Sequence, residues 1–203
     1  MEQIISKEEL DKISEESGEA RGATFKNALD FVLKKEGPDG LKKIENLMEE
    51  LGYPIKSTEI KLMNFYPLNS YLVLQLAIKN FFNYDDKDFQ EMGEFMAKSS
   101  MIMRLFMKYF ASLDNLIKQG PRAWRMYFST GELKVVEINK EKKYMVSRLE
   151  DFAYGQLHCQ IIKGFYSSII QMILRSKVTC EEIKCPLRGD EYHEFLFKWE
   201  NDK

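Results

Sequence analysis

The chain has 203 residues and 44% hydrophobic residues, which suits one folded domain and excludes global disorder. Its 30 basic and 32 acidic residues give a formal net charge of −2, without the positive surplus that nucleic-acid binding favours. The sequence has no apolar run long enough for a membrane span and no secretory signal at its start.

The first part of the chain reads as helical. Residues 1–19 are charged and sparsely apolar, and we expect a short helix or an arm there, ahead of a single ligand-binding domain over 20–203. Apolar residues at helical spacing predict a helix after Gly22. Gly37-Pro38-Asp39 predicts a break, followed by a second helix with Gly52 at its C-terminal end.

The middle of the chain continues this helical pattern. A helix is expected from Tyr66-Pro67 to about Phe82, and its run from Tyr71 to Ile78 is apolar almost all round, which predicts a central helix. Asp85 or Asp86 suits the start of the next helix. A further helix is expected between Ser99-Ser100 and a break at Gly120-Pro121.

After Pro121 the pattern changes to strands around one helix at Tyr154–Leu174. The expected strands are 123–128, 133–138, 144–146, 178–185 and 192–199. The order indicates an α+β fold, in which an N-terminal helical bundle packs on an antiparallel sheet and a C-terminal helix crosses to the last strand pair.

Four residues in the last quarter offer the ligand types that zinc accepts in tetrahedral sites, namely Cys159, Glu182, Cys185 and His193. Helical spacing places Cys159 on a core-facing side, and strand alternation places His193 on the same face as Phe195 and other aromatic residues. Glu182 and Cys185 are three residues apart, so both reach one ion only if the strand bends or ends near Cys185-Pro186.

The residues alone leave other interpretations open. Cys159 can be a small buried hydrophobe and His193 a core histidine with satisfied hydrogen bonds. Cys180 can replace Glu182 as a ligand, and His158 is a further candidate. The odd number of cysteines, three, fits free thiols in the cytoplasm better than a disulfide framework.

The segment Glu182–Phe195 resembles the terminal signature of the 4-vinyl-reductase-like small-molecule-binding domain. That signature has a Glu three residues before a Cys, then Gly-Asp, then a second Cys eight residues after the first, where this chain has His193. Metal-binding members, such as sensor domains of phenol-responsive bacterial activators, add a Cys 23 residues before the Glu, which corresponds to Cys159. The resemblance implies a zinc ion held by Cys159, Glu182, Cys185 and His193.

The front half is similar to the related heme–nitric-oxide-binding superfamily and its heme-free relatives. The matching stretches are Gly22-Ala23-Thr24-Phe25, Phe31-Val32, Gly37, Gly40, Phe65-Tyr66-Pro67 and Glu91-Met92-Gly93. This similarity implies a ligand cavity between helices and sheet, and often a dimer. Heme-binding members need a His in the helical region and a Tyr-x-Ser-x-Arg motif. This chain has no His before His158 and has Gly131 in place of that Arg, so we expect a heme-free member.

A candidate pocket follows from a cluster of methionines with aromatic residues nearby, because methionine adapts to varied apolar ligands. Such a stripe is more often part of a plain core or of a dimer surface. The candidate pocket residues are Met92, Met96, Met103, Phe106, Trp124, Tyr127 and Tyr154.

We therefore predict a non-enzymatic, cytoplasmic domain that binds a small apolar or aromatic molecule as a sensor or carrier and holds a structural zinc. A homodimer and a separate signalling partner are expected, with no nucleic-acid partner. One alternative is an accessory protein or reductase in tetrapyrrole metabolism, which would need a reductant partner because no dinucleotide-binding motif is present. The other is a protein-interaction scaffold resembling the related vesicle-tethering subunits.

Overall fold

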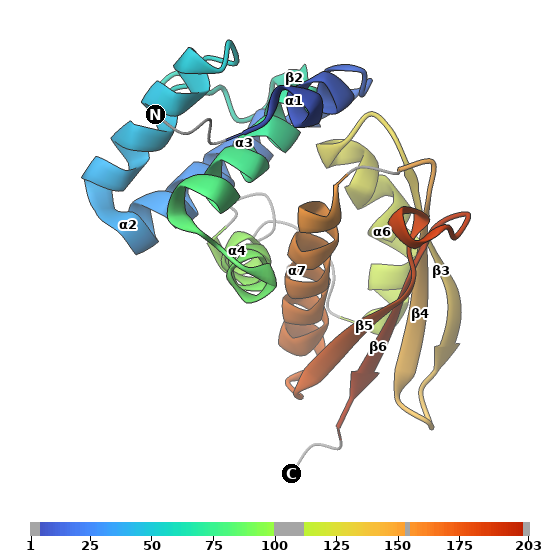
Figure 1. Ribbon diagram of the computed structural model, residues 1–203. Helices are drawn as coiled ribbons and strands as arrows, with labels where there is room; N and C mark the ends of the chain where they lie inside the picture. Colours follow the sequence, from blue (N-terminus) through green and yellow to red (C-terminus); the bar gives the residue numbers. More distant parts are fainter. Residues whose placement is uncertain (1–4, 100–111, 153–154, 201–203) are drawn as a thin grey trace.

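The computed structural model describes residues 5–99, 112–152 and 155–200, and it has an α+β fold (Figure 1). Its helices are α1 (Lys7–Ser14), α2 (Gly22–Glu50), α3 (Leu68–Phe82), α4 (Asp86–Ser99), α6 (Leu113–Tyr127) and α7 (Gln156–Leu174). Its strands are β1 (Glu19–Arg21), β2 (Phe65–Pro67), β3 (Glu132–Asn139), β4 (Tyr144–Glu150), β5 (Val178–Lys184) and β6 (His193–Trp199). A short 3₁₀ turn, η1 (Pro186–Arg188), connects the last two strands.

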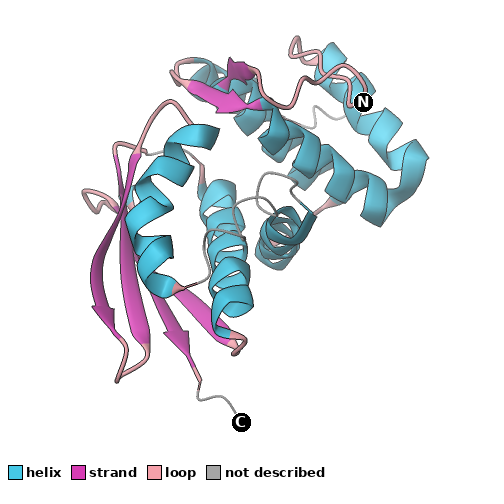
Figure 2. Ribbon diagram, turned by 180° about the vertical axis from the view of Figure 1, so that it is seen from behind, coloured by secondary structure: helices cyan, strands magenta, loops and turns pink. Residues whose placement is uncertain are grey.

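The larger sheet is antiparallel with the strand order β3-β4-β6-β5. Helices α6 and α7 pack against one face of this sheet, as the view from behind shows (Figure 2). Helix α4 crosses α7 and packs against it, and α2 and α3 contact these helices from the side away from the sheet. The helical bundle therefore reaches the sheet through α6 and α7.

The N-terminal segment forms a helix rather than a loose arm. Helix α1 begins with a capping box, in which Ser6 accepts a hydrogen bond from the backbone N–H of Glu9 and the Glu9 carboxylate accepts one from the backbone of Ser6. A second small sheet, formed by β1 and β2, was not predicted, because three-residue strands are too short to give an alternating pattern.

The break predicted at Gly37-Pro38 is confirmed as a sharp kink inside α2. Gly37 has φ 74° and ψ −176°, a backbone conformation that is open almost only to glycine. The second half of α2 ends as expected, since Gly52 follows the helix with φ 82°.

Replacing Gly37 with alanine should destabilise the protein by about 1–3 kcal/mol, because any Cβ strains this backbone conformation. No other atom lies within 4 Å of the position that a Cβ would take, so the loss would measure backbone strain alone. Urea unfolding would test this against Lys43→Ala, an exposed site on the same helix that should change stability by less than about 0.5 kcal/mol. Equal stability of the two variants would contradict the expectation.

The strand predicted at 123–128 is wrong, because α6 continues through Pro121 to Tyr127. Leu113, Leu116, Gly120 and Trp124 are all buried at helical spacing, so one apolar stripe extends past the proline. Burying that stripe outweighs the one hydrogen bond that proline cannot donate. Phe128 keeps only an isolated bridge to Ala20.

The remaining elements are of the predicted type, and the last strand pair starts and ends within one residue of its expected limits. Strand β4 is longer than expected, since it continues to Glu150, four residues beyond the expected end at Val146. The helix expected after Ser99-Ser100 lies partly at residues 100–111, outside the described residues, and its end is the first half of α6. Among the described residues no helix is long and apolar enough to cross a membrane.

Candidate functional site

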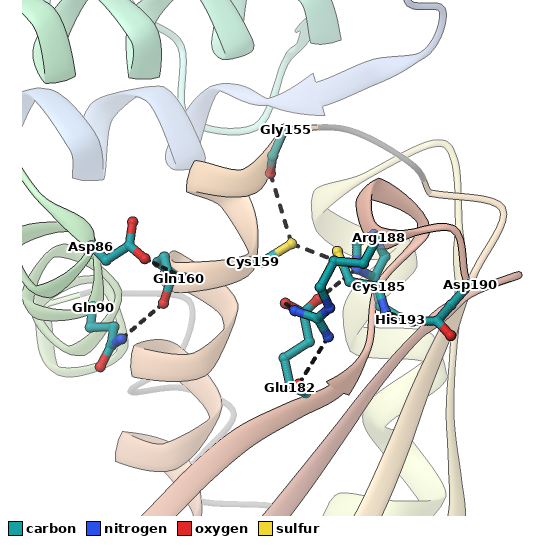
Figure 3. Close-up of polar contacts among 10 residues, drawn as sticks. All are labelled: Asp86, Gln90, Gly155, Cys159, Gln160, Glu182, Cys185, Arg188, Asp190 and His193. Carbon is teal, nitrogen blue, oxygen red and sulfur yellow. Dashed lines mark hydrogen bonds and ion pairs between the residues drawn. The ribbon is translucent and has the colours of Figure 1, made fainter.

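The four residues predicted to bind a metal lie together at the interface between α7 and the sheet (Figure 3). We call Cys159, Glu182, Cys185 and His193 the ligand cluster. Their nearest ligand atoms all lie within 4.8 Å of one another. Cys159 comes from α7, Glu182 from β5, Cys185 from the residue after β5, and His193 from the start of β6.

One distance in the ligand cluster matches the separation of two zinc ligands, whereas a second is that of a hydrogen bond. The Cys159 Sγ and His193 Nδ1 atoms are 3.6 Å apart, and His193 Nδ1 lies 2.8 Å from Glu182 Oε1. Zinc bonds of tetrahedral geometry would separate a sulfur and a nitrogen ligand by about 3.5 Å. Thiolate and imidazole ligands both suit zinc, which is one of several transition metals that they bind.

The spacing problem between Glu182 and Cys185 is solved by a β-bulge. In the pairing with β6, Glu182 lies opposite Phe195 and Lys184 lies opposite Glu194, so Ile183 is an extra residue. An extra residue in one strand shifts the following side chains to the other face. Both Glu182 and Cys185 therefore point into the ligand cluster.

The connection between β5 and β6 is held in place by its own hydrogen bonds. The Asp190 carboxylate accepts a hydrogen bond of 2.8 Å from the backbone N–H of Cys185. The Arg188 guanidinium donates to the backbone carbonyl of Glu182 at 3.0 Å and lies 3.5 Å from its carboxylate. These contacts fix Glu182, before the bulge, and Cys185, two residues after it (Figure 3).

Burial controls the charge of the ligand cluster. It raises the pKa of the Cys159 thiol well above its ordinary value, and the Glu182 carboxylate raises it further. Burial also raises the pKa of Cys185. Burial opposes ionisation of Glu182 as well, but the hydrogen bond with His193 holds its pKa below the ordinary value. A divalent cation would supply the positive charge that favours both thiolates.

The two alternative ligands lie elsewhere. Cys180 is half-buried in β5 and does not belong to the ligand cluster, and neither does His158. His158 precedes Cys159 in α7, so its side chain leaves the helix in a different direction and lines a cavity on the other side.

This cavity lies between α7 and the helices α2, α3, α4 and α6, and has a volume of about 50 Å³. Of the candidate pocket residues, Met96, Trp124 and Tyr127 line it, whereas Met92 is buried in the core without lining it. Met103, Phe106 and Tyr154 lie outside the described residues. No charged side chain occurs among the described residues that line the cavity.

Sequence reasoning missed several residues of the cavity wall, including Thr24, Tyr71 and His158. Tyr71 lies in the strongly apolar helix α3 and Thr24 in the first turn of α2, and at either place a single polar residue gives no signal of its own. Burial, and secondarily the charge of His193, lowers the pKa of His158 to about 3, so its ring is neutral near pH 7.

No protein-family model and no curated protein matches the chain. Solved structures do match: an H-NOX domain from Shewanella oneidensis in the Fe(II)CO ligation state is 14% identical, with a TM-score of 0.66 over 90% of this chain and 99% of that one. An Fe(II) unliganded H-NOX mutant from K. algicida is 15% identical, with a TM-score of 0.65 over 90% of this chain and 97% of that one. The chain therefore has the fold of these H-NOX structures.

A further match is a trafficking protein particle complex subunit 3 from Naegleria fowleri, covalently bound to palmitic acid. It is 17% identical and covers 64% of this chain and 93% of that one, with a TM-score of 0.47. This likeness is too low to support any conclusion about the scaffold alternative.

The iron in these H-NOX structures raises the question of whether heme fits here, and it counts against our expectation of a heme-free protein. His158 is a buried imidazole at the cavity and could ligate iron. However, pockets that bind drug-sized ligands have volumes of roughly 300–1,000 Å³. The described cavity is about 50 Å³, and the described residues that line it include no Arg or Lys for the propionates. The cavity as described does not fit heme.

Proposed function

We propose that the protein is a non-enzymatic sensor or carrier, in which an apolar cavity binds a small molecule and the ligand cluster holds a structural zinc ion. One observation carries the proposal: His158 and Cys159 are neighbours in α7, yet the first lines the cavity and the second belongs to the ligand cluster. The same helix therefore forms a wall of both sites.

The chemistry of the ligand cluster supports a structural rather than a catalytic role. Four protein ligands complete a tetrahedral zinc site, whereas catalytic zinc sites keep one position open for water or substrate. Cys159, Cys185 and His193 are at most 3% exposed, which leaves little access for a substrate. Zinc in this position would fix α7 to β5 and β6, and with them the wall of the cavity.

The binding role rests on the cavity and on the arrangement of helices around it. A ligand that contacts α2 and α3 on one side and α7 on the other would stabilise one arrangement of these elements over others. Such a shift could be passed on through a dimer contact or to a separate signalling partner. Cytoplasmic location and the homodimer remain parts of this proposal.

Metal analysis of the purified protein, together with native mass spectrometry and a visible absorption spectrum, tests the proposal. We expect one zinc ion per chain that survives dialysis, and no heme absorbance after incubation with hemin. A metal-free protein that unfolds at the same temperature with and without chelator would overturn the zinc site. Stoichiometric heme binding that is lost in His158→Ala would show that the cavity is a heme site and not a site for a small apolar molecule.

A further inference from the structure

Several residues that line the cavity carry buried polar atoms without hydrogen-bond partners. Among the described residues, six buried side-chain nitrogen or oxygen atoms have no hydrogen-bond partner. Three of them, Thr24 Oγ1, Tyr71 Oη and His158 Nε2, belong to residues that line this one cavity. A buried polar group without a partner costs free energy, so their grouping calls for a group that pairs with them.

His158 is held firmly in its position. Its ring lies 5.2 Å from the ring of Phe128 and 5.1 Å from that of Phe152, measured between centroids. The Gln75 side-chain nitrogen lies 3.3 Å from His158 Nδ1. An amide nitrogen can only donate, so Nδ1 accepts and the neutral ring carries its proton on Nε2. His158 is thus a fixed N–H donor without a described acceptor.

The other two atoms without partners belong to the hydroxyl groups of Thr24 and Tyr71, which can also donate a hydrogen bond. Thr24 comes from α2, Tyr71 from α3 and His158 from α7, so a single acceptor between them would link three helices. The absence of charged side chains among the described lining residues disfavours an ion, because a buried charge needs a partner.

The size of the cavity limits the ligand further. A volume of about 50 Å³ accommodates roughly three to five water-sized groups of about 10–15 Å³ each. An engineered cavity that takes benzene is larger, about 150 Å³. The described cavity therefore favours a compact molecule over an aromatic one.

We propose that the cavity binds a compact, uncharged and largely apolar molecule through one hydrogen-bond acceptor, such as a carbonyl oxygen, held by His158, Thr24 and Tyr71. This inference rests on the small-molecule-binding part of the proposed function and names its ligand class. It does not depend on the zinc ion.

Acetone and isobutene provide a matched pair of probes, since they have the same shape and differ in the acceptor. The protein has only two histidines, so ¹⁵N-histidine labelling gives a spectrum in which the Nε2–H signal of His158 can be identified. We expect acetone at millimolar concentration to shift this signal. Isobutene should enter the cavity without forming the hydrogen bond.

Variants that keep the cavity shape separate the hydrogen bond from packing. Thr24→Val and Tyr71→Phe should each lower the affinity for acetone by about fivefold, and neither should lower the affinity for isobutene. His158→Phe should also make the affinities for acetone and isobutene more nearly equal, because the N–H donor to the acetone oxygen is lost. Ser168→Ala is the matched control, because its hydroxyl is likewise buried without a described partner but does not line the cavity.

The outcomes distinguish this inference from the proposed function. A folded, zinc-loaded protein whose His158 signal ignores acetone would overturn the inference alone. So would equal losses of acetone and isobutene affinity in Thr24→Val and Tyr71→Phe. A metal-free protein that still binds acetone with the expected variant pattern would support the inference and overturn the structural zinc.

Discussion

Cys159→Ala is expected to abolish zinc binding and to lower the melting temperature by roughly 10–20 °C. Structural zinc contributes about 10–16 kcal/mol to the folding of small zinc-finger peptides, so a loss of about 5 kcal/mol is a moderate expectation in a larger domain. For a chain of this length, each kcal/mol corresponds to about 2–4 °C. Calorimetry and metal analysis of the same preparation would measure both effects.

Cys180→Ala is the matched control for this experiment. Cys180 lies in β5, two residues before Glu182, but outside the ligand cluster. The control removes the same atoms from a half-buried site and should keep its zinc, losing at most about 1–2 kcal/mol from packing. Chelator should lower the melting temperature of the wild type and of Cys180→Ala, but not that of Cys159→Ala. Equal melting temperatures and equal zinc contents in the two variants would refute the zinc site.

The ligand cluster could be predicted from sequence because its parts follow local rules. Helical and strand periodicity places Cys159 and His193 on inward faces, and the resemblance to a known signature supplies the spacing between the four residues. The sequence left one step open, namely whether the side chains of Glu182 and Cys185, three residues apart, point to the same face of the sheet. A bulge at Ile183 settles it, but bulges depend on pairing with another strand and leave little trace in the sequence.

The extent of α6 could not be predicted because two signals conflict at Gly120-Pro121. Local propensity favours a break, whereas the buried stripe that ends in Trp124 requires the helix to continue. The Trp124 indole N–H also donates to the carbonyl of Thr130 at 2.9 Å, which fixes the chain just after the helix. Tertiary packing, which local patterns do not contain, decided the outcome.

The cavity wall was only partly predictable for a related reason. Methionine and aromatic residues marked Met96 and Trp124, since such side chains are typical of apolar pockets. Thr24, Tyr71 and His158 are far apart in the sequence, and they meet only because α2, α3 and α7 pack around one space. Their shared lack of hydrogen-bond partners becomes visible only in three dimensions.

Gly164→Ala is expected to destabilise the protein by about 3 kcal/mol or more, because α4 and α7 cross with their backbones almost touching. A Cβ at Gly164 would lie 2.0 Å from the backbone oxygen of Gln90, and one at Gly93 would lie 2.1 Å from that of Ile161. Backbone atoms cannot move aside as a flexible side chain can, so the two helices would have to separate. Urea unfolding would measure the loss.

The same separation should affect function, since the helix crossing also positions the cavity. Hydrogen bonds from Gln90 to Gln160 and from Gln160 to Asp86, 2.8 and 3.0 Å long, span the crossing and would be stretched (Figure 3). Met96, the α4 residue in the cavity wall, would move away from α7. The matched control is Gly120→Ala in α6, where no atom lies within 4 Å of the added Cβ and where we expect a change below about 1 kcal/mol. If both alanine variants unfold at the same urea concentration, the helix crossing does not limit stability, and its glycines need another explanation.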